Sequence, residues 1–207
     1  MNIKNIFEKS ADFTIKRIIE IFGIILIIFS IFLLLSFASY SPEDPNFIFN
    51  SEKEIENILG FRGSYTSDIF FQSFGVISYL IPVTLIFTGI YIFRSKKIFI
   101  LLRNLFYTIL YIILGSFFFS FFYKETFWLT INGNGGFVGS YLNNSFLHDF
   151  TKINQMVAYY FLIIIILLIF LISINFKLKL LPKLVSNLLT LFKRKEKKII
   201  YTEIEGN

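Results

Sequence analysis

Few residues of this chain have the types and spacing that chemistry requires. The sequence holds no cysteine and one histidine, His148, so it offers no thiolate ligand and no histidine cluster for a metal. Asp149 follows His148, but no nucleophile accompanies the pair, and we expect His148 to be a solvated loop residue. We therefore assign no catalytic, cofactor-binding or metal-ligating residue.

Four glycines stand close together and invite comparison with a phosphate-binding loop. They are Gly133, Gly135, Gly136 and Gly139. A phosphate loop continues with a lysine and a hydroxyl residue, which are missing here. The glycines therefore predict a flexible loop and no nucleotide site.

The elements that carry these residues are long apolar stretches. Four of them contain no Lys or Arg, over residues 21–39, 69–93, 105–122 and 157–176. A helix needs about 20 apolar residues to cross the ~30 Å hydrocarbon core of a bilayer. The chain is 55% hydrophobic with a mean hydropathy of +0.68. The sequence thus predicts an all-α integral membrane protein with four transmembrane helices, because backbone in lipid must satisfy its own hydrogen bonds.

The basic residues predict which side each loop faces. Of 20 Lys and Arg, 16 lie before the first span, between spans two and three, or after span four. The loops 40–68 and 123–156 hold the other four. The positive-inside rule places both termini in the cytoplasm. The predicted parts are a cytoplasmic segment 1–20, a transmembrane domain 21–176 and a cytoplasmic tail 177–207.

The first span has one alternative interpretation, a cleaved signal peptide ending at Ser36-Phe37-Ala38. Its apolar run of about 19 residues exceeds the usual 7–15 of such peptides, so we favour a retained helix.

The tail predicts an amphipathic basic helix next to the membrane. Apolar residues share one helical face, at Leu181, Leu184, Val185, Leu188 and Phe192. A basic cluster follows, at Lys193, Arg194, Lys195, Lys197 and Lys198. Each basic residue near an anionic leaflet contributes about 1 kcal/mol to binding. The cluster sets topology, and specific lipid recognition is a second, less favoured role.

Prolines and glycines predict where the first outer loop turns. Ser41-Pro42 and Asp44-Pro45 favour extended or turn backbone directly after span one. The pair Ser51 and Glu54 resembles a capping box and predicts a short helix over 52–59. Gly60 and Gly63 predict a turn after it.

The spans themselves hold few polar or helix-breaking residues. Spans two, three and four contain no Asp, Glu, Lys, Arg or His, which argues against a pump or a proton-coupled transporter. Gln72 is expected to be a packing or interfacial residue. Pro82 predicts a kink within span two, and the small residues Gly115, Ser116 and Ser120 in span three favour close helix approach.

Several segments together resemble the amino-terminal four-helix membrane domain of the FtsK/SpoIIIE family of DNA translocases. They are SYSPEDP at 39–45, Asn57 with Gly60 and Gly63, Phe74-Gly75, Tyr79-Leu80 with Pro82, and Gly135-Gly136 with Gly139. Their order and spacing match the family over about residues 20–176. The candidate interaction residues are Ser41, Pro42, Asp44, Pro45, Gly60, Gly63, Gly75, Pro82, Gly135, Gly136 and Gly139.

The resemblance implies a non-catalytic anchor in a bacterial inner membrane, at the division septum, acting in cell division and chromosome segregation. It implies a homo-oligomer that contacts division-site membrane proteins. The 207 residues lack the GxxxxGK[ST] motif, so the ATP-driven motor is expected in cis or in trans. No cofactor and no direct nucleic-acid binding by this chain are expected. The alternatives are a small transporter or channel subunit and a free-standing accessory protein.

Overall fold

The structure, a computed structural model, describes residues 3–45, 54–123, 129 and 131–176. The chain divides into two compact units, residues 1–175 and 176–207, and only the first is described below. Its helices are α1 (Ile3–Ala38), α2 (Gly60–Phe74), the 3₁₀ helix η1 (Gly75–Tyr79), α3 (Leu80–Ser95), α4 (Phe99–Phe122), α5 (Gly136–Asn143), α6 (Phe146–Ile153) and α7 (Gln155–Ser173). The described residues form no strand. The amphipathic helix and basic cluster predicted for 177–207 lie outside them.

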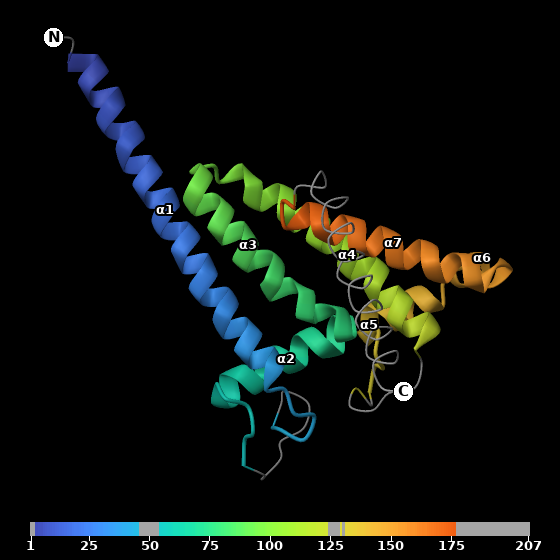
Figure 1. Cartoon of the computed structure of the whole chain (residues 1–207). Coiled ribbons are helices and arrows are strands. Elements are labelled where there is room, and N and C mark those ends of the chain that lie inside the picture. Colours follow the sequence, from blue (N-terminus) through green and yellow to red (C-terminus); the bar gives the residue numbers. More distant parts are fainter. Residues whose placement is uncertain (1–2, 46–53, 124–128, 130, 177–207) are drawn as a thin grey trace, which may run out of the picture. The chain divides into compact units, whose positions relative to one another are not determined.

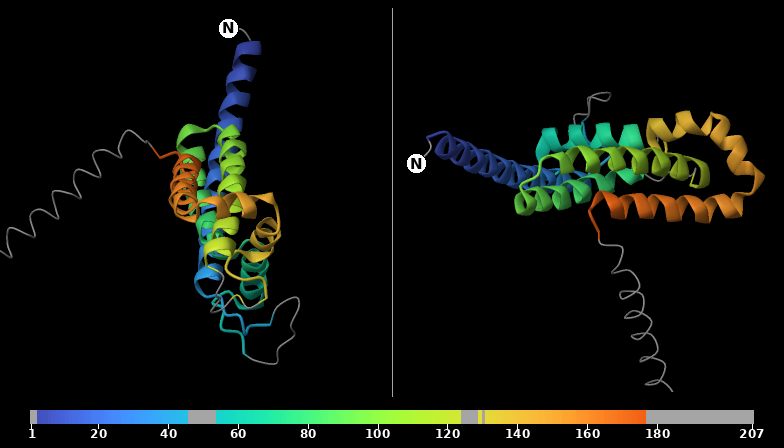
Figure 2. Two further views of the ribbon diagram at one scale, coloured as in Figure 1. Left: turned by 90° about the vertical axis from the view of Figure 1, so that its right-hand side faces the viewer. Right: turned by 90° about the horizontal axis from the view of Figure 1, so that it is seen from above.

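Four helical segments are long and apolar enough to cross a membrane, which confirms the predicted all-α fold with four spans. They cover Glu8–Ala38, Gly60–Ser95, Phe99–Phe122 and Gln155–Ser173. Helix α1 runs without a break from Ile3, so the segment before residue 21 continues the helix of the first span. The N-terminal part of α1 projects past the turn between α3 and α4 in all views (Figures 1 and 2).

The second span is bent rather than straight (Figure 1). Helix α2 ends at Phe74, and Gly75 follows with φ +75° and ψ −154°, a conformation that essentially only glycine adopts. Pro82 is the third residue of α3, which continues directly from η1, and it lies seven residues after Gly75. The predicted kink at Pro82 is therefore wrong, because Gly75 makes the bend. Together η1 and α3 are about 34 Å long, which suffices to cross the bilayer.

Helices α1 and α3 pack backbone against backbone at two glycines. A Cβ added to Gly23 would lie 2.9 Å from the carbonyl oxygen of Gly89, and one added to Gly89 would lie 2.8 Å from that of Gly23. Both distances are too short for any larger residue without movement of a helix. Near the α3–α4 turn, the Glu20 carboxylate lies 2.8 Å from the Lys96 ammonium group and joins the same two helices.

Polar side chains meet inside the bundle between α3, α4 and α7. The Thr84 hydroxyl lies 3.0 Å from that of Tyr111 and 3.3 Å from that of Ser173. Asn104 donates from Nδ2 to the Thr88 hydroxyl over 2.9 Å. All five side chains are buried. These residues were not predicted from the sequence, although Thr84 and Thr88 share one face of a helix at a spacing of four residues.

The outward faces of the bundle are apolar, in keeping with lipid contact. Ile21, Ile25 and Phe29 on α1 are each 57% exposed. On α7 the single buried residue within the helix is Ser173. A hydrophobic core also exists, near the junction of α1, α2 and η1, with the members Leu33, Phe37, Phe71, Ile77, Ile81, Tyr111, Ile112 and Leu129.

The described part of the second loop region holds two short helices, preceded by non-helical backbone at residues 131–135. Gly136–Asn143 forms α5, which packs against α2 and α4, so the predicted flexible glycine loop is wrong for these residues. The reason is close backbone contact at its glycines, described below. His148 lies in α6, partly buried, with its Nδ1 2.8 Å from the Asn143 Oδ1 and its ring against Phe121. It is therefore not the solvated loop residue that we expected.

Candidate functional site

The residues of the family-like segments meet at one end of the bundle, where α1 ends and α2 begins. We call the hydrogen-bonded group there the α1–α2 clasp, formed by Ser36, Ser39, Asp44, Asn57, Gly63 and Ser64. Its members come from the last turn of α1, the following loop and the first turn of α2. Figure 1 shows these segments side by side below α1.

Asp44 closes the loop of the clasp with two charged hydrogen bonds. The backbone N–H of Glu56 donates to its Oδ1 over 2.8 Å, and the N–H of Asn57 donates to its Oδ2 over 3.0 Å. Asp44 is only 3% exposed, so these bonds satisfy a carboxylate that water barely reaches. In a helix, both N–H groups would instead donate to backbone carbonyl oxygens. Residues 54–59 are accordingly not helical, and the helix predicted over 52–59 is wrong in its described part.

Asn57 connects this loop to the end of α1. Its Nδ2 donates to the carbonyl oxygens of Ser36 over 2.9 Å and of Ser39 over 3.2 Å, two acceptors that the ending helix leaves without intrahelical donors. Its Oδ1 accepts the N–H of Leu59 over 3.1 Å. One amide thus stabilises the end of α1 and shapes the approach to α2.

Serine hydroxyls complete the clasp from both sides. Ser36 donates to the carbonyl oxygen of Gly63 over 2.7 Å, and Ser64 donates to that of Pro45 over 2.9 Å. Gly63 lies within α2 and not in the predicted turn, and a Cβ there would lie 2.0 Å from the Asn57 Oδ1. Gly60, with φ +62°, makes the turn that starts α2.

A second polar chain extends from the clasp along α2. The buried Asp68 accepts a hydrogen bond from the Tyr40 hydroxyl over 3.2 Å and from Gln72 Nε2 over 3.3 Å. Burial raises the pKa of the Tyr40 hydroxyl, and the Asp68 carboxylate raises it further, so Tyr40 remains a donor. Asn132 in turn donates from Nδ2 to Gln72 Oε1 over 3.2 Å. Gln72 thus joins the two predicted outer loops.

The glycines of the second loop pack directly on the bend of span two and on α4. The N–H of Val76 donates to the carbonyl oxygen of Asn134 over 2.9 Å. A Cβ on Gly75 would lie 1.9 Å from that oxygen, and a Cβ on Gly139 would lie 2.2 Å from the carbonyl oxygen of Ser116. We call this group, Gly75, Gly135, Gly136, Gly139 and Ser116, the glycine contact. The sequence predicts that Ser116 lets another helix pack closely against its own, and α5 is the helix that packs there.

The structure brings together most of the predicted interaction residues, but not all. Asp44, Pro45, Gly60 and Gly63 lie in or next to the clasp, and Gly75, Gly135, Gly136 and Gly139 form the glycine contact. Ser41 and Pro42 lie in the turn before Asp44, with Pro42 exposed. Pro82 lies apart from both groups, in α3. The cluster Lys193–Lys198 falls outside the described residues. Four further residues of the clasp or its surroundings carry no signal in the sequence: Ser36, Ser64, Asp68 and Asn132.

The arrangement suits rigid presentation of a surface. Its polar groups bond to one another, and several are buried. In the described part of the chain, no group of three His, Asp or Glu residues is placed to hold a metal ion. What the geometry builds is two loop segments, 39–45 and 54–59, held by hydrogen bonds on the ends of two membrane helices.

Comparison with known proteins identifies the family. A family model described as the 4TM region of DNA translocase FtsK/SpoIIIE matches residues 15–183, which is well over half of the chain. The match begins within α1, continues through α7 and includes both the clasp and the glycine contact. No solved structure matches the chain. The chain therefore belongs to the family of the four-transmembrane region of FtsK/SpoIIIE DNA translocases.

Proposed function

We propose that this chain is the non-catalytic membrane anchor of an FtsK-type DNA translocase and acts at the division septum of a bacterial inner membrane. The family match over residues 15–183 carries the proposal. The clasp supports it, because loop segments 39–45 and 54–59, held by buried hydrogen bonds, present a constant surface to a partner. Division-site membrane proteins and further copies of this chain are the proposed partners, and the proposed motor acts in cis or in trans.

The charge distribution supports an orientation with both termini in the cytoplasm. The α3–α4 turn carries Lys96 and Lys97, flanked by Arg94 and Arg103. The clasp lies at the other ends of the spans, within a loop that holds six acidic residues. The clasp and α5 therefore face the periplasm in our proposal.

Cysteine labelling in intact cells tests this orientation, since the chain has no native cysteine. Single cysteines at Glu54 and Lys152 should react with a membrane-impermeant thiol reagent, because both residues are exposed on the proposed outer side. Cysteines at Lys9 and Arg94, exposed on the inner side, should react only after the cells are opened. The reverse pattern would contradict the orientation.

Localisation tests the division role. A fluorescent fusion of the 207-residue chain should concentrate at the septum of dividing cells, and depletion of the native protein should give filamentous cells. A fusion that carries Lys152→Gln, an exposed change on α6, serves as a control and should leave septal fluorescence unchanged. Even fluorescence around the membrane, together with normal cell length after depletion, would overturn the proposal and favour an accessory role outside division.

A further inference from the structure

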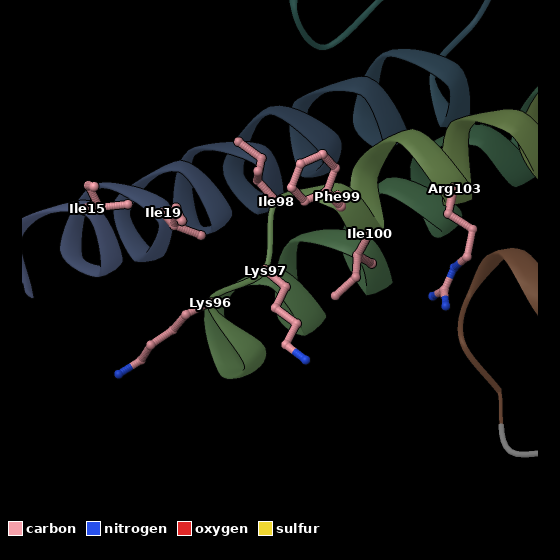
Figure 3. A pocket seen from close by; sticks show the side chains of 8 residues that line it. All are labelled: Ile15, Ile19, Lys96, Lys97, Ile98, Phe99, Ile100 and Arg103. Atoms are coloured by element: carbon pink, nitrogen blue, oxygen red, sulfur yellow. The ribbon is translucent and has the colours of Figure 1, made fainter. Parts of the chain in front are cut away.

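An open groove lies between α1 and the α3–α4 turn, at the end of the bundle opposite the clasp. Its volume is about 540 Å³. Ile15 and Ile19 of α1 form one wall, and residues 96–100 with Arg103 form the other (Figure 3). None of the lining residues is acidic. The groove is therefore a largely apolar hollow with a positively charged edge.

The basic side chains of this groove differ in whether an acidic residue already pairs with them. Lys96 is paired with Glu20 over 2.8 Å. Lys97 is exposed, and no carboxylate pairs with it among the described residues. Arg103 donates to the side-chain oxygens of Asn104 and Asn175, which are neutral amides, so its charge remains uncompensated. Lys97 and Arg103 thus leave two positive charges available for an anion.

The charged ends and most apolar side chains occupy different sides of the groove, with Ile100 between Lys97 and Arg103 as the exception (Figure 3). In Figure 3 the nitrogen ends of Lys96, Lys97 and Arg103 lie along one side, whereas Ile98 and Phe99 lie toward α1. Phe99 is 79% exposed, a large apolar surface that free phosphate would leave uncovered. A ligand that matches both sides needs an anionic head joined to a hydrocarbon chain.

We propose that the groove binds one anionic phospholipid, with its phosphodiester against Lys97 and Arg103 and an acyl chain along Ile15, Ile19 and Phe99. Under the proposed orientation, the groove lies at the level of the cytoplasmic leaflet, where anionic headgroups are available. The site is distinct from the basic tail at 193–198, since every lining residue belongs to the first unit. The lipid fills the space between α1 and the turn and so holds the projecting part of α1 against the bundle.

Native mass spectrometry of the purified 207-residue chain tests the site with dioleoyl phosphatidylglycerol. Changing both Lys97→Gln and Arg103→Gln should weaken binding of this lipid about 30-fold, since each basic residue contributes about a factor of five. Binding of dioleoyl phosphatidylcholine should change little. The double variant Lys9→Gln with Lys152→Gln removes the same charge from exposed positions outside the groove and should change neither affinity by more than about 2-fold.

Phe99→Ala separates a lipid from a free phosphate. It should weaken phosphatidylglycerol binding several-fold without affecting folding, because the ring is mostly exposed. Equal phosphatidylglycerol affinity in the native chain and the Lys97/Arg103 variant would overturn the proposal. So would a site that inorganic phosphate fills equally well and that ignores Phe99→Ala. The assay uses purified protein and depends on neither orientation nor septal localisation, so its failure is distinguishable from failure of the anchor role.

Discussion

Gly75→Ala is expected to destabilise the protein by at least about 3 kcal/mol. The backbone of Gly75, at φ +75° and ψ −154°, costs any other residue about 1–3 kcal/mol. The new Cβ would also lie 1.9 Å from the carbonyl oxygen of Asn134, and that atom is backbone, which cannot rotate away. Either α5 and its approach loop separate from the bend, or the bend itself changes. Thermal unfolding of the detergent-solubilised protein, followed by circular dichroism, measures the loss.

Gly60→Ala is the matched control for this effect. Gly60 also has a positive φ, +62°, but a Cβ there would meet nothing within 4 Å. Only the left-handed backbone conformation then costs energy, about 1–2 kcal/mol. A loss for Gly75→Ala that exceeds the loss for Gly60→Ala by more than the difference in backbone cost, about 1 kcal/mol, isolates the contact with Asn134. Equal losses at both positions would show that the glycine contact contributes nothing of its own.

Asp44→Ala is expected to open the clasp while leaving the four spans folded. The change leaves the N–H groups of Glu56 and Asn57 without their acceptor. Hydrogen bonds to charged groups contribute about 1.5–3 kcal/mol each, so two of them correspond to at least about 100-fold in the local opening equilibrium. Amide hydrogen exchange at Glu56 and Asn57 should accelerate by about that factor. Amides within α4 should not change.

The clasp variant also connects structure to the proposed role. Asp44→Ala should lose septal fluorescence, because the surface that meets division partners is no longer fixed. Glu54→Gln removes the same charge from a neighbouring exposed residue and should change neither hydrogen exchange nor localisation. Normal septal fluorescence in a variant with a demonstrably open clasp would separate the clasp from partner binding.

The number of spans and the family were accessible from the sequence. Apolar length decides whether a helix can cross a bilayer, and it is a property of a continuous segment. The order and spacing of the proline, glycine and asparagine motifs likewise sufficed to indicate the family that the comparison then showed. The four spans of α1, α2–α3, α4 and α7 required no knowledge of which helix contacts which.

The positions at which the helices break or bend were harder to predict from the sequence. Pro82 carries the strongest local signal for a kink, yet it lies in the first turn of α3, and the bend lies at Gly75. Gly75 makes the bend because Asn134, from the second loop, accepts the N–H of Val76 and requires a residue without a side chain beside it. The deciding contact joins segments that lie far apart in the chain, so no local rule identifies it.

Sequence alone thus determined what the membrane enforces: four apolar helices, with basic residues gathered on alternate loops. Tertiary structure alone decided what each motif residue does. Asp44 meets Asn57 across 13 residues, Gln72 meets Asn132 across 60, and Gly75 meets the loop before α5. The physical reason is the range of the interactions. Transfer of a segment into lipid sums over neighbouring residues, whereas a buried hydrogen bond or a close backbone contact requires two distant segments to arrive at one place.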